Sequence, residues 1–423
     1  MSERPASLQR HRMQGPSGSS VTDGEVRYAP VKSLWFTGMA TVAVVGGAST
    51  FSWTALAVFL ATTAAVLLLG HSLGSHRKFI HDSYQCPKWL EYTLVWFGVQ
   101  VGLAGPLGLL RQHELRDYAQ RLPDCHDYLR HGRSFWGDAW WQLHCELHLA
   151  HPPALHIEPR LADDRFYRFL ERTWMWQQVP PALLLYAAGG WAFVVWGVCA
   201  RVTAGVLGHW LIGWFAHNRG GMHYEVRDAA VQGRNIPFTS LLTMGESWHN
   251  NHHAFPGSAR LGLFPGEWDP GWWALMVLRR VGLVWDLRLP AALPPRAELH
   301  ACDAMADAEL ARHAGGAAPS ADRPTLVDVL GWCWRRGETG PLVGPAAHLT
   351  VGAWRKVLGR AVPFHVRPDA RRLTLVVQDR RLQGLPALCV AVSRRGGVMR
   401  ALGLCLAPFA VLFENTRTAL DVT

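Results

Sequence analysis

Three histidines are concentrated in one short stretch of the sequence. The stretch Glu-Ser-Trp-His-Asn-Asn-His-His-Ala-Phe-Pro occupies positions 246–256 and contains His249, His252 and His253. Residues three or four positions apart share one face of a helix, so two of these imidazoles can point at one ion. Neutral imidazole is the commonest metal ligand among side chains. The stretch therefore predicts a metal site, with a solvated histidine-rich turn as the alternative.

Further histidines recur where long apolar segments end. His76 and His81 lie in the basic stretch Ser-His-Arg-Lys-Phe-Ile-His, His113 follows a second apolar segment, and His217 closes a third. A single histidine at such a place often borders lipid headgroups, but repeated groups favour a shared metal site. We expect His76 and His81 to bind rather than His71, and His217 rather than His209.

The composition indicates a membrane protein. Apolar residues make up 49% of the 423 residues, and charged residues only 17%, against about 25% in a typical soluble domain. The net charge of +10 is carried by scattered arginines rather than by a basic groove with interleaved aromatic residues. We therefore expect anionic lipid, and not nucleic acid, to be the partner of this charge.

The ends of the chain and its cysteines suggest where it resides. The eight cysteines are far apart and form no Cys-x-x-Cys motif, which is typical of a reducing compartment. Residues 1–30 are rich in Ser, Gly and Arg and lack the apolar core of a signal peptide. We expect them to be disordered, and their positive charge predicts a cytoplasmic N-terminus.

Two apolar segments have the length of helical hairpins. Residues 33–76 contain no charged side chain and are interrupted by Gly46-Gly47, whereas residues 173–218 contain only Arg201, expected near a turn or the interface. Each is long enough for two spans of roughly 20 residues. Residues 89–110 form a third hydrophobic segment, which either lies against the bundle or dips into the interface. The predicted fold class is all-α, an integral membrane bundle of about four transmembrane helices with a histidine-rich cytoplasmic cap.

The composition changes after Pro290, where Ala, Arg, Gly and Pro become frequent. We therefore divide the chain into a disordered basic N-terminus (1–30), a membrane domain (31–290) and a C-terminal extension of unknown fold and role (291–423). Within the membrane domain, residues 271–289 resemble an amphipathic interfacial helix. Within the extension, residues 372–392 can hold two short strands.

The number of histidines restricts the chemistry. If the hairpins fold together, the histidine groups meet just outside the bilayer, with more nitrogens than one tetrahedral zinc can use. Imidazole-rich sites suit iron. A site at the membrane surface suggests an aliphatic substrate, and oxidation of an unactivated C–H bond requires a cofactor because no side chain supplies that oxidant. Dioxygen at a pair of irons meets this requirement.

Two histidine boxes resemble those of a known family. His76-Arg77-Lys78-Phe79-Ile80-His81 and His249-Asn250-Asn251-His252-His253-Ala254-Phe255-Pro256, in this order around two hairpins, are similar to the membrane fatty acyl desaturases, in particular the acyl-CoA delta-9 branch. The resemblance covers about residues 30–290. It implies a four-span, cytoplasm-facing enzyme with two iron ions. Such an enzyme takes O2, and two electrons from a ferredoxin- or cytochrome-type protein, to desaturate a fatty acyl thioester. The implied metal ligands are His76, His81, His113, His217, His249, His252 and His253.

The middle box departs from the family pattern. The pattern His-x-x-His-His is here His113-Glu114-Leu115-Arg116-Asp117, and the asparagine usually found four residues before the extra histidine is Gly213. Arg116 cannot bind a metal, whereas Asp117 can through oxygen. Either Asp117, or His144 and His148 at helical spacing, completes the metal pair, or one metal site is weakened. We favour completion and include Asp117 among the ligands; Glu246 and Asn250 are candidates for orienting the imidazoles.

Two other functions fit the same residues. A hydroxylase needs the same oxidant on the same scaffold, and a non-catalytic membrane protein would retain the helices without a working metal pair. The mass of the product distinguishes a hydroxylase from a desaturase, and the metal content of the purified protein distinguishes a non-catalytic protein from an enzyme.

Overall fold

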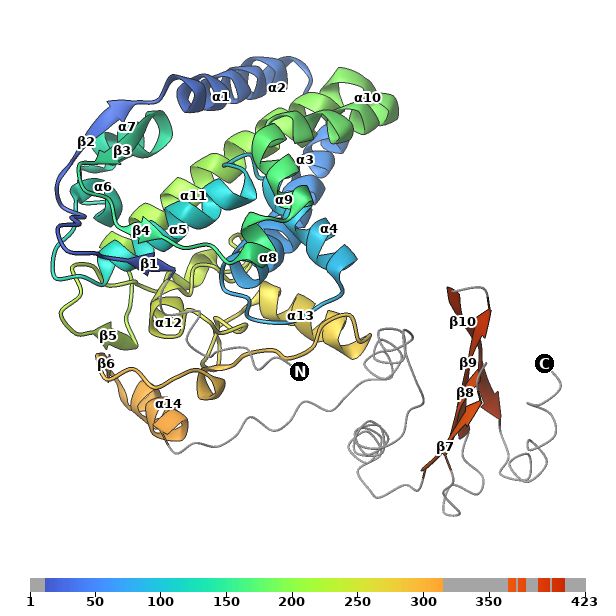
Figure 1. Cartoon of the computed structure of the whole chain (residues 1–423). Coiled ribbons are helices and arrows are strands. Elements are labelled where there is room, and N and C mark those ends of the chain that lie inside the picture. The colour runs from blue at the N-terminus through green and yellow to red at the C-terminus, as the bar shows by residue number, and fades with distance from the viewer. Residues whose placement is uncertain (1–11, 315–363, 370–371, 378–386, 396–397, 408–423) are drawn as a thin grey trace. The chain divides into compact units, whose positions relative to one another are not determined.

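The computed structural model describes residues 12–314, 364–369, 372–377, 387–395 and 398–407 (Figure 1). Two compact units are present. The first comprises residues 1–277 and 284–320, and the second comprises residues 278–283 and 321–423. The first unit is mostly helical and contains every predicted site residue. The helical fold class expected from the sequence is confirmed for this unit.

The first apolar segment is a helical hairpin. One arm consists of α1 (Pro30–Thr41), the π-helical η2 (Val42–Gly46) and α2 (Gly47–Ser49); the other consists of α3 (Trp53–Ala65) and the π-helical η3 (Val66–Ile80). The Ser52 side chain caps the second arm by accepting a hydrogen bond from the Ala55 amide at 3.1 Å. The arms are 20 and 28 residues long, and both are apolar enough to cross a membrane.

The second apolar segment is a hairpin as well. It contains η4 (Trp176–Gln178), α10 (Val179–Val194), η5 (Val195–Ala200) and α11 (Arg201–Asn218), which together form the third candidate span. The helical path breaks at Gly189 and Gly190, where Gly190 has a φ of 65° that favours glycine. Beyond the break the chain returns, since the Arg201 guanidinium donates to Gln178 Oε1 at 2.7 Å. The 43-residue span is therefore two antiparallel arms.

Arg201 does not lie at the turn of the second hairpin. It is buried within the second hairpin, on the arm that follows the break at Gly189 and Gly190. Its guanidinium donates to Gln178, to the Gly197 carbonyl at 2.7 Å and to the Gln100 carbonyl. Five donors with fixed geometry explain why the charge is stable here, because buried polar groups must find partners.

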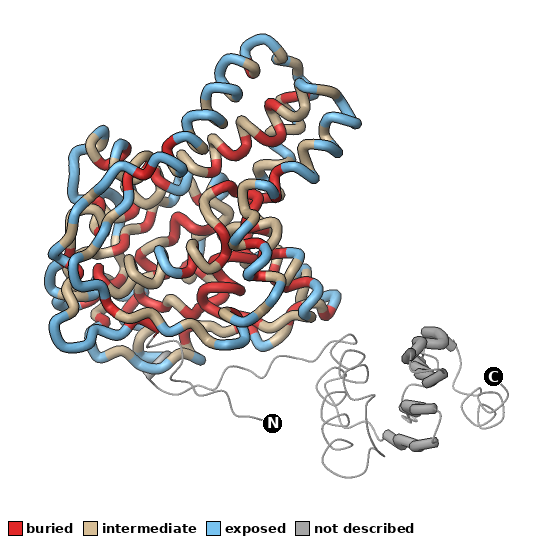
Figure 2. Tube along the Cα trace, turned by 45° about the horizontal axis from the view of Figure 1, so that its top comes forward, coloured by how far each residue is buried: buried red, intermediate tan, exposed pale blue. Residues whose placement is uncertain are grey.

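The hairpin arms differ from the rest of the unit in exposure. In an apolar window of 18 residues within each candidate span, only 11% of the first and 17% of each of the other two are buried. Figure 2 shows mostly exposed and intermediate residues along the projecting arms, with buried residues gathered in the body beside them. Apolar side chains left uncovered over such lengths are typical of lipid-facing helices.

The third hydrophobic segment lies against the bundle. It forms α4 (Lys88–Val99) and the start of α5 (Pro106–Gln120), and it is not among the candidate spans found in the described residues. α4 packs closely on η3, because Gly70 and Gly74 of η3 touch the α4 backbone at Phe97 and Leu94. Small residues four positions apart allow this close approach of two helices.

This contact gives a prediction for Gly74. A Cβ at position 74 would overlap the Leu94 carbonyl, so Gly74→Ala should lower the stability by about 1–3 kcal/mol. The thermal unfolding midpoint of the detergent-solubilised protein measures this effect. Gly38→Ala is the matched control, since open space surrounds Gly38 and alanine favours a helix by up to about 1 kcal/mol. A Gly74→Ala protein that melts at or above the wild type would contradict the close approach.

Short elements complete the first unit as a cap. Its other helices are α6 (Asp127–Arg130), α7 (Phe135–His144), α8 (Pro159–Ala162), α9 (Arg165–Thr173), η6 (Pro237–Thr239), α12 (His249–Ala254), α13 (Pro270–Arg280), η7 (Pro290–Ala292) and α14 (Ala304–Ala314). The expected interfacial helix over 271–289 is thus shorter and ends at Arg280. Three antiparallel strand pairs join β1 (Met13–Gln14) to β4 (Ala154–Leu155), β2 (Gly24–Tyr28) to β3 (Cys145–Leu149), and β5 (Tyr224–Val226) to β6 (Leu299–Ala301).

Both expected boundaries of the membrane domain differ from the structure. Residues 12–28, expected to be disordered, contain β1 and β2, and Arg12 is buried against Glu114 at 2.7 Å and Glu158 at 3.0 Å. Past Pro290 the first unit continues, because β6 pairs with β5 and α14 packs on the same cluster as Phe255.

Within the second unit, one antiparallel sheet is formed by four strands in sequence order: β7 (Phe364–Asp369), β8 (Arg372–Val377), β9 (Ala387–Arg395) and β10 (Val398–Ala407).

Candidate metal centre

The seven predicted histidines form two clusters. His76, His81, His113 and His252 form one, here called the four-histidine cluster; His217, His249 and His253 form the other, the three-histidine cluster. Within each cluster the ligand nitrogens lie within 4.8 Å of one another. The prediction that distant histidines converge is confirmed, whereas His71 and His209, whose rings are 5.5 Å apart, belong to neither cluster.

Helix α12 supplies nitrogens to both clusters. His249 and His253 are four positions apart and share one face, with their Nε2 atoms 3.0 Å apart. His252 is turned by about 100° from His253 and faces the other cluster, with its Nε2 3.3 Å from His76 Nε2. One helical turn therefore separates the three histidines of the motif into two sets.

The π-helical winding of η3 explains the spacing of His76 and His81. On an α-helix, residues five positions apart are offset by about 140°. In η3 the His81 amide instead donates to the His76 carbonyl at 3.1 Å, the i to i+5 bond of a π-helix, which returns the two side chains to nearly one side. Their ring centroids are 4.8 Å apart.

Burial favours the neutral form of five cluster histidines. Burial lowers the pKa of His113 to about 4. Burial also lowers the pKa of His81, His249, His252 and His253 far below the ordinary value, and neighbouring histidines lower it further. Neutral imidazoles with converging Nε2 atoms leave lone pairs without hydrogens between them, and a metal ion is the group that such a donor set fits.

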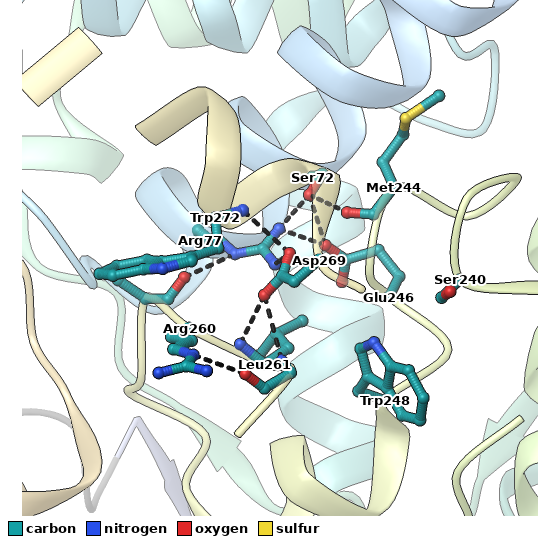
Figure 3. Close-up of polar contacts among 12 residues, drawn as sticks. Ser72, Arg77, Ser240, Met244, Glu246, Trp248, Arg260, Leu261, Asp269 and Trp272 are labelled. Carbon is teal, nitrogen blue, oxygen red and sulfur yellow. Dashed lines mark hydrogen bonds and ion pairs between the residues drawn. The ribbon is translucent and has the colours of Figure 1, made fainter. Parts of the chain in front are cut away.

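Arg77 anchors the first box from inside (Figure 3). Its buried guanidinium donates to Glu246 at 2.7 Å, to Asp269 at 2.8 Å and to the Ala259 carbonyl at 2.9 Å. The other Glu246 oxygen lies 2.5 Å from His76 Nδ1, which turns Nε2 toward the cluster. Burial would raise the pKa of Glu246, but the adjacent His76 and Arg77 outweigh burial and hold it below the usual range.

Two asparagines of the last box fix α12 rather than touch the imidazoles. Asn250 Oδ1 accepts from the His223 and Tyr224 amides, and its Nδ2 donates to the carbonyls of Tyr224 and Gly233. Asn251 donates to Glu267 and to the Leu261 carbonyl, both at 2.8 Å. The expectation that Glu246 and Asn250 orient the site fits Glu246 directly, whereas Asn250 acts by holding the helix.

The middle box lies on α5 beside both clusters. Asp117 Oδ2 is 3.6 Å from His113 Nδ1, but Asp117 is not part of either cluster. Arg116 points elsewhere, because it contacts His131 Nε2 and donates to Gln142 Oε1 at 3.0 Å. His131 is held in turn by Asp138, 2.8 Å from its Nδ1.

The alternative of His144 and His148 as a metal pair is wrong. The sequence interpretation placed both on one helix, but α7 ends at His144 and His148 lies in strand β3. His144 Nδ1 is 2.8 Å from Ser33 Oγ, and His148 is exposed. The strand forms because residues 145–149 pair with β2, and the sequence interpretation assigned the segment around β2 to disorder.

Comparison with known proteins places the chain in a family. No family model matches it. The chain is 37% identical over 246 residues to the sn-1 stearoyl-lipid 9-desaturase of Anabaena variabilis, covering 57% of this chain and 86% of that protein. It is 33% identical to the sn-2 palmitoyl-lipid 9-desaturase of Nostoc sp. (strain 36), covering 59% and 86%, and 32% identical to the acyl-CoA C20 Delta5-desaturase of Anemone leveillei, covering 59% and 78%. The chain therefore belongs to the membrane fatty acyl desaturases, a family of oxidoreductases.

Proposed function

We propose that the protein introduces a double bond into a fatty acyl chain, in the manner of a delta-9 desaturase, at a pair of iron ions held by its histidine clusters. The observation that carries this proposal is the convergence of seven buried or half-buried imidazoles into two sets that share α12. The family, whose relatives include lipid-linked and CoA-linked desaturases, supports the substrate class.

The residues that would hold the ions follow from the clusters. His76, His81, His113 and His252 would hold one, and His217, His249 and His253 the other; Asp117 stays a candidate oxygen ligand beside His113. Two iron ions with O2 would supply the oxidant for an unactivated C–H bond. The protein's part is to shield the imidazoles from water and to orient them, through burial and through the contact of Glu246 with His76.

The reaction balances with an external electron donor. Removal of two hydrogens from the acyl chain provides two electrons and two protons. A ferredoxin- or cytochrome-type protein provides two more electrons and the solvent two more protons, so that O2 is reduced to two molecules of water. We propose that the two hairpins cross the membrane four times and place the N-terminus and the cap in the cytoplasm, where such a carrier is found. The residues proposed to carry this chemistry lie within 31–290, and residues 12–28 and 291–314 belong to the same unit.

Expression in a host that makes only saturated chains tests the function. We expect new monounsaturated chains, lighter than their precursors by two hydrogens, in lipid profiles measured by mass spectrometry. Assays with the purified protein, given either an acyl-CoA or a glycerolipid, identify the carrier; the sequence predicts the CoA thioester. A product heavier by one oxygen would instead show a hydroxylase. An unchanged profile with iron-loaded protein present would refute desaturation.

A further inference from the structure

The side chain of Gln120 faces the three-histidine cluster from α5. It is buried, with 1% of its surface exposed, and its Oε1 lies 3.1 Å from His217 Nε2. The amide orientation is fixed, because Gln120 Nε2 donates to the Leu129 carbonyl at 2.8 Å and a carbonyl can only accept. The atom directed at His217 is therefore the oxygen, which is itself only an acceptor.

The tautomer of His217 is fixed from its other side. Its Nδ1 lies 2.7 Å from the Gly213 carbonyl, so Nδ1 carries the proton. In a neutral imidazole Nε2 then holds a lone pair. Two lone pairs, one on Gln120 Oε1 and one on His217 Nε2, thus face each other at hydrogen-bond distance with no hydrogen between them. A positive charge must lie between or beside these atoms.

We propose that Gln120 Oε1 is a ligand of the metal ion bound by His217, His249 and His253. This inference rests on the proposed function, since it assumes a metal in the three-histidine cluster. Ligands about 2.1 Å from one ion and at right angles are about 3 Å apart. The separations of His217 Nε2 from Gln120 Oε1, 3.1 Å, and from His249 Nε2, 3.2 Å, both match this value. The alternative, a doubly protonated His217, would bury a cation beside other imidazoles.

The position of Gln120 on α5 explains how this chain tolerates its altered middle box. His113, Asp117 and Gln120 are at positions i, i+4 and i+7 of α5 and so share one face. His113 belongs to the four-histidine cluster, while Gln120 contacts the three-histidine cluster. Arg116 lies one turn before Gln120 and contacts His131 instead. An oxygen ligand from α5 thus stands in for an imidazole that the family pattern places earlier on the same helix.

The test is the affinity of the metal-free protein for Co2+, whose visible spectrum reports the number and type of ligands. Chelator competition on detergent-purified protein should give two bound ions per chain in the wild type. Gln120→Leu removes the oxygen while keeping the volume, so the affinity of one ion should fall by roughly 10–100-fold, with a changed spectrum for that ion. Gln120→Glu keeps an oxygen and should hold both ions at least as tightly as the wild type.

Gln142→Leu is the matched control, and the outcomes separate the two proposals. Gln142 also donates to a backbone carbonyl, but its oxygen already accepts from Arg116, so its loss should leave both affinities unchanged. Two ions bound with unchanged affinity by folded Gln120→Leu would overturn the inference and leave the metal pair intact. If that variant does not fold, a weaker second ion in Gln120→Glu overturns it. A wild type that binds no ion overturns this inference and the proposed function together.

Discussion

His249→Ala is expected to reduce desaturation to the background of the host, a loss of more than about 100-fold. The reason is its central place in the three-histidine cluster, where its Nε2 lies 3.2 Å from His217 Nε2 and 3.0 Å from His253 Nε2. Removing a group that only orients a metal ligand already costs roughly 10–100-fold, and losing the ligand itself costs more. Monounsaturated product per amount of protein, with bound iron measured in parallel, gives the result.

His148→Ala provides the comparison for this variant. His148 is an exposed histidine on β3 of the same unit and belongs to neither cluster, so its removal should leave product and iron at wild-type levels. Full activity after loss of His249 would show that the three-histidine cluster is not part of the reaction centre.

Arg77→Met is expected to give the largest loss of stability. The substitution keeps an unbranched apolar stem but leaves the Glu246 and Asp269 carboxylates buried without their guanidinium (Figure 3). Breaking a buried ion pair by removing one partner costs about 3–5 kcal/mol, which for a domain of this size lowers the melting midpoint by roughly 10 °C. Metal binding should weaken as well, because Glu246 then no longer holds His76 in place.

The same substitution at an exposed arginine shows how much of the stability loss comes from burial of the ion pair and how much from the change of charge alone. Arg27 pairs with Glu25 at 2.9 Å, but both side chains are more than 60% exposed. Such surface pairs contribute about 0–1 kcal/mol, so Arg27→Met should melt close to the wild type. Equal melting of Arg77→Met and Arg27→Met would disprove the role assigned to the buried network.

The sequence was informative wherever a residue's chemistry is unusual in its setting. Histidines at the ends of uncharged segments identified the seven cluster residues, and paired glycines identified the turn of the second hairpin. In the first hairpin the chain stays helical through Gly46-Gly47 and turns after Ser49. Composition was a poor guide to the N-terminal boundary. Residues 12–28 are polar, yet Arg12 and the pairing of β2 with β3 order them through partners more than 100 positions away.

Two other features could not be predicted from the sequence: the π-helical winding of η3, and the use of Gln120 in place of a histidine missing from the middle box. The i to i+5 winding that aligns His76 with His81 has no simple residue signature. Gln120 belongs to no motif and lies in a polar stretch, so the sequence does not single it out. Its proposed role as a ligand follows only from its fixed amide orientation and from the tautomer of His217. Helical spacing is the one feature of the sequence that points to Gln120, since position 120 lies on the same face of α5 as His113.

The sharing of α12 between the clusters has a consequence for how the protein would acquire its ions. This six-residue helix carries His252 toward one cluster and His249 and His253 toward the other, so occupation of either cluster orders the ligands of both. The second ion would then bind to a helix whose ordering entropy has already been lost. Loading should accordingly be cooperative, with few singly occupied chains at half saturation and a steep, sigmoidal titration.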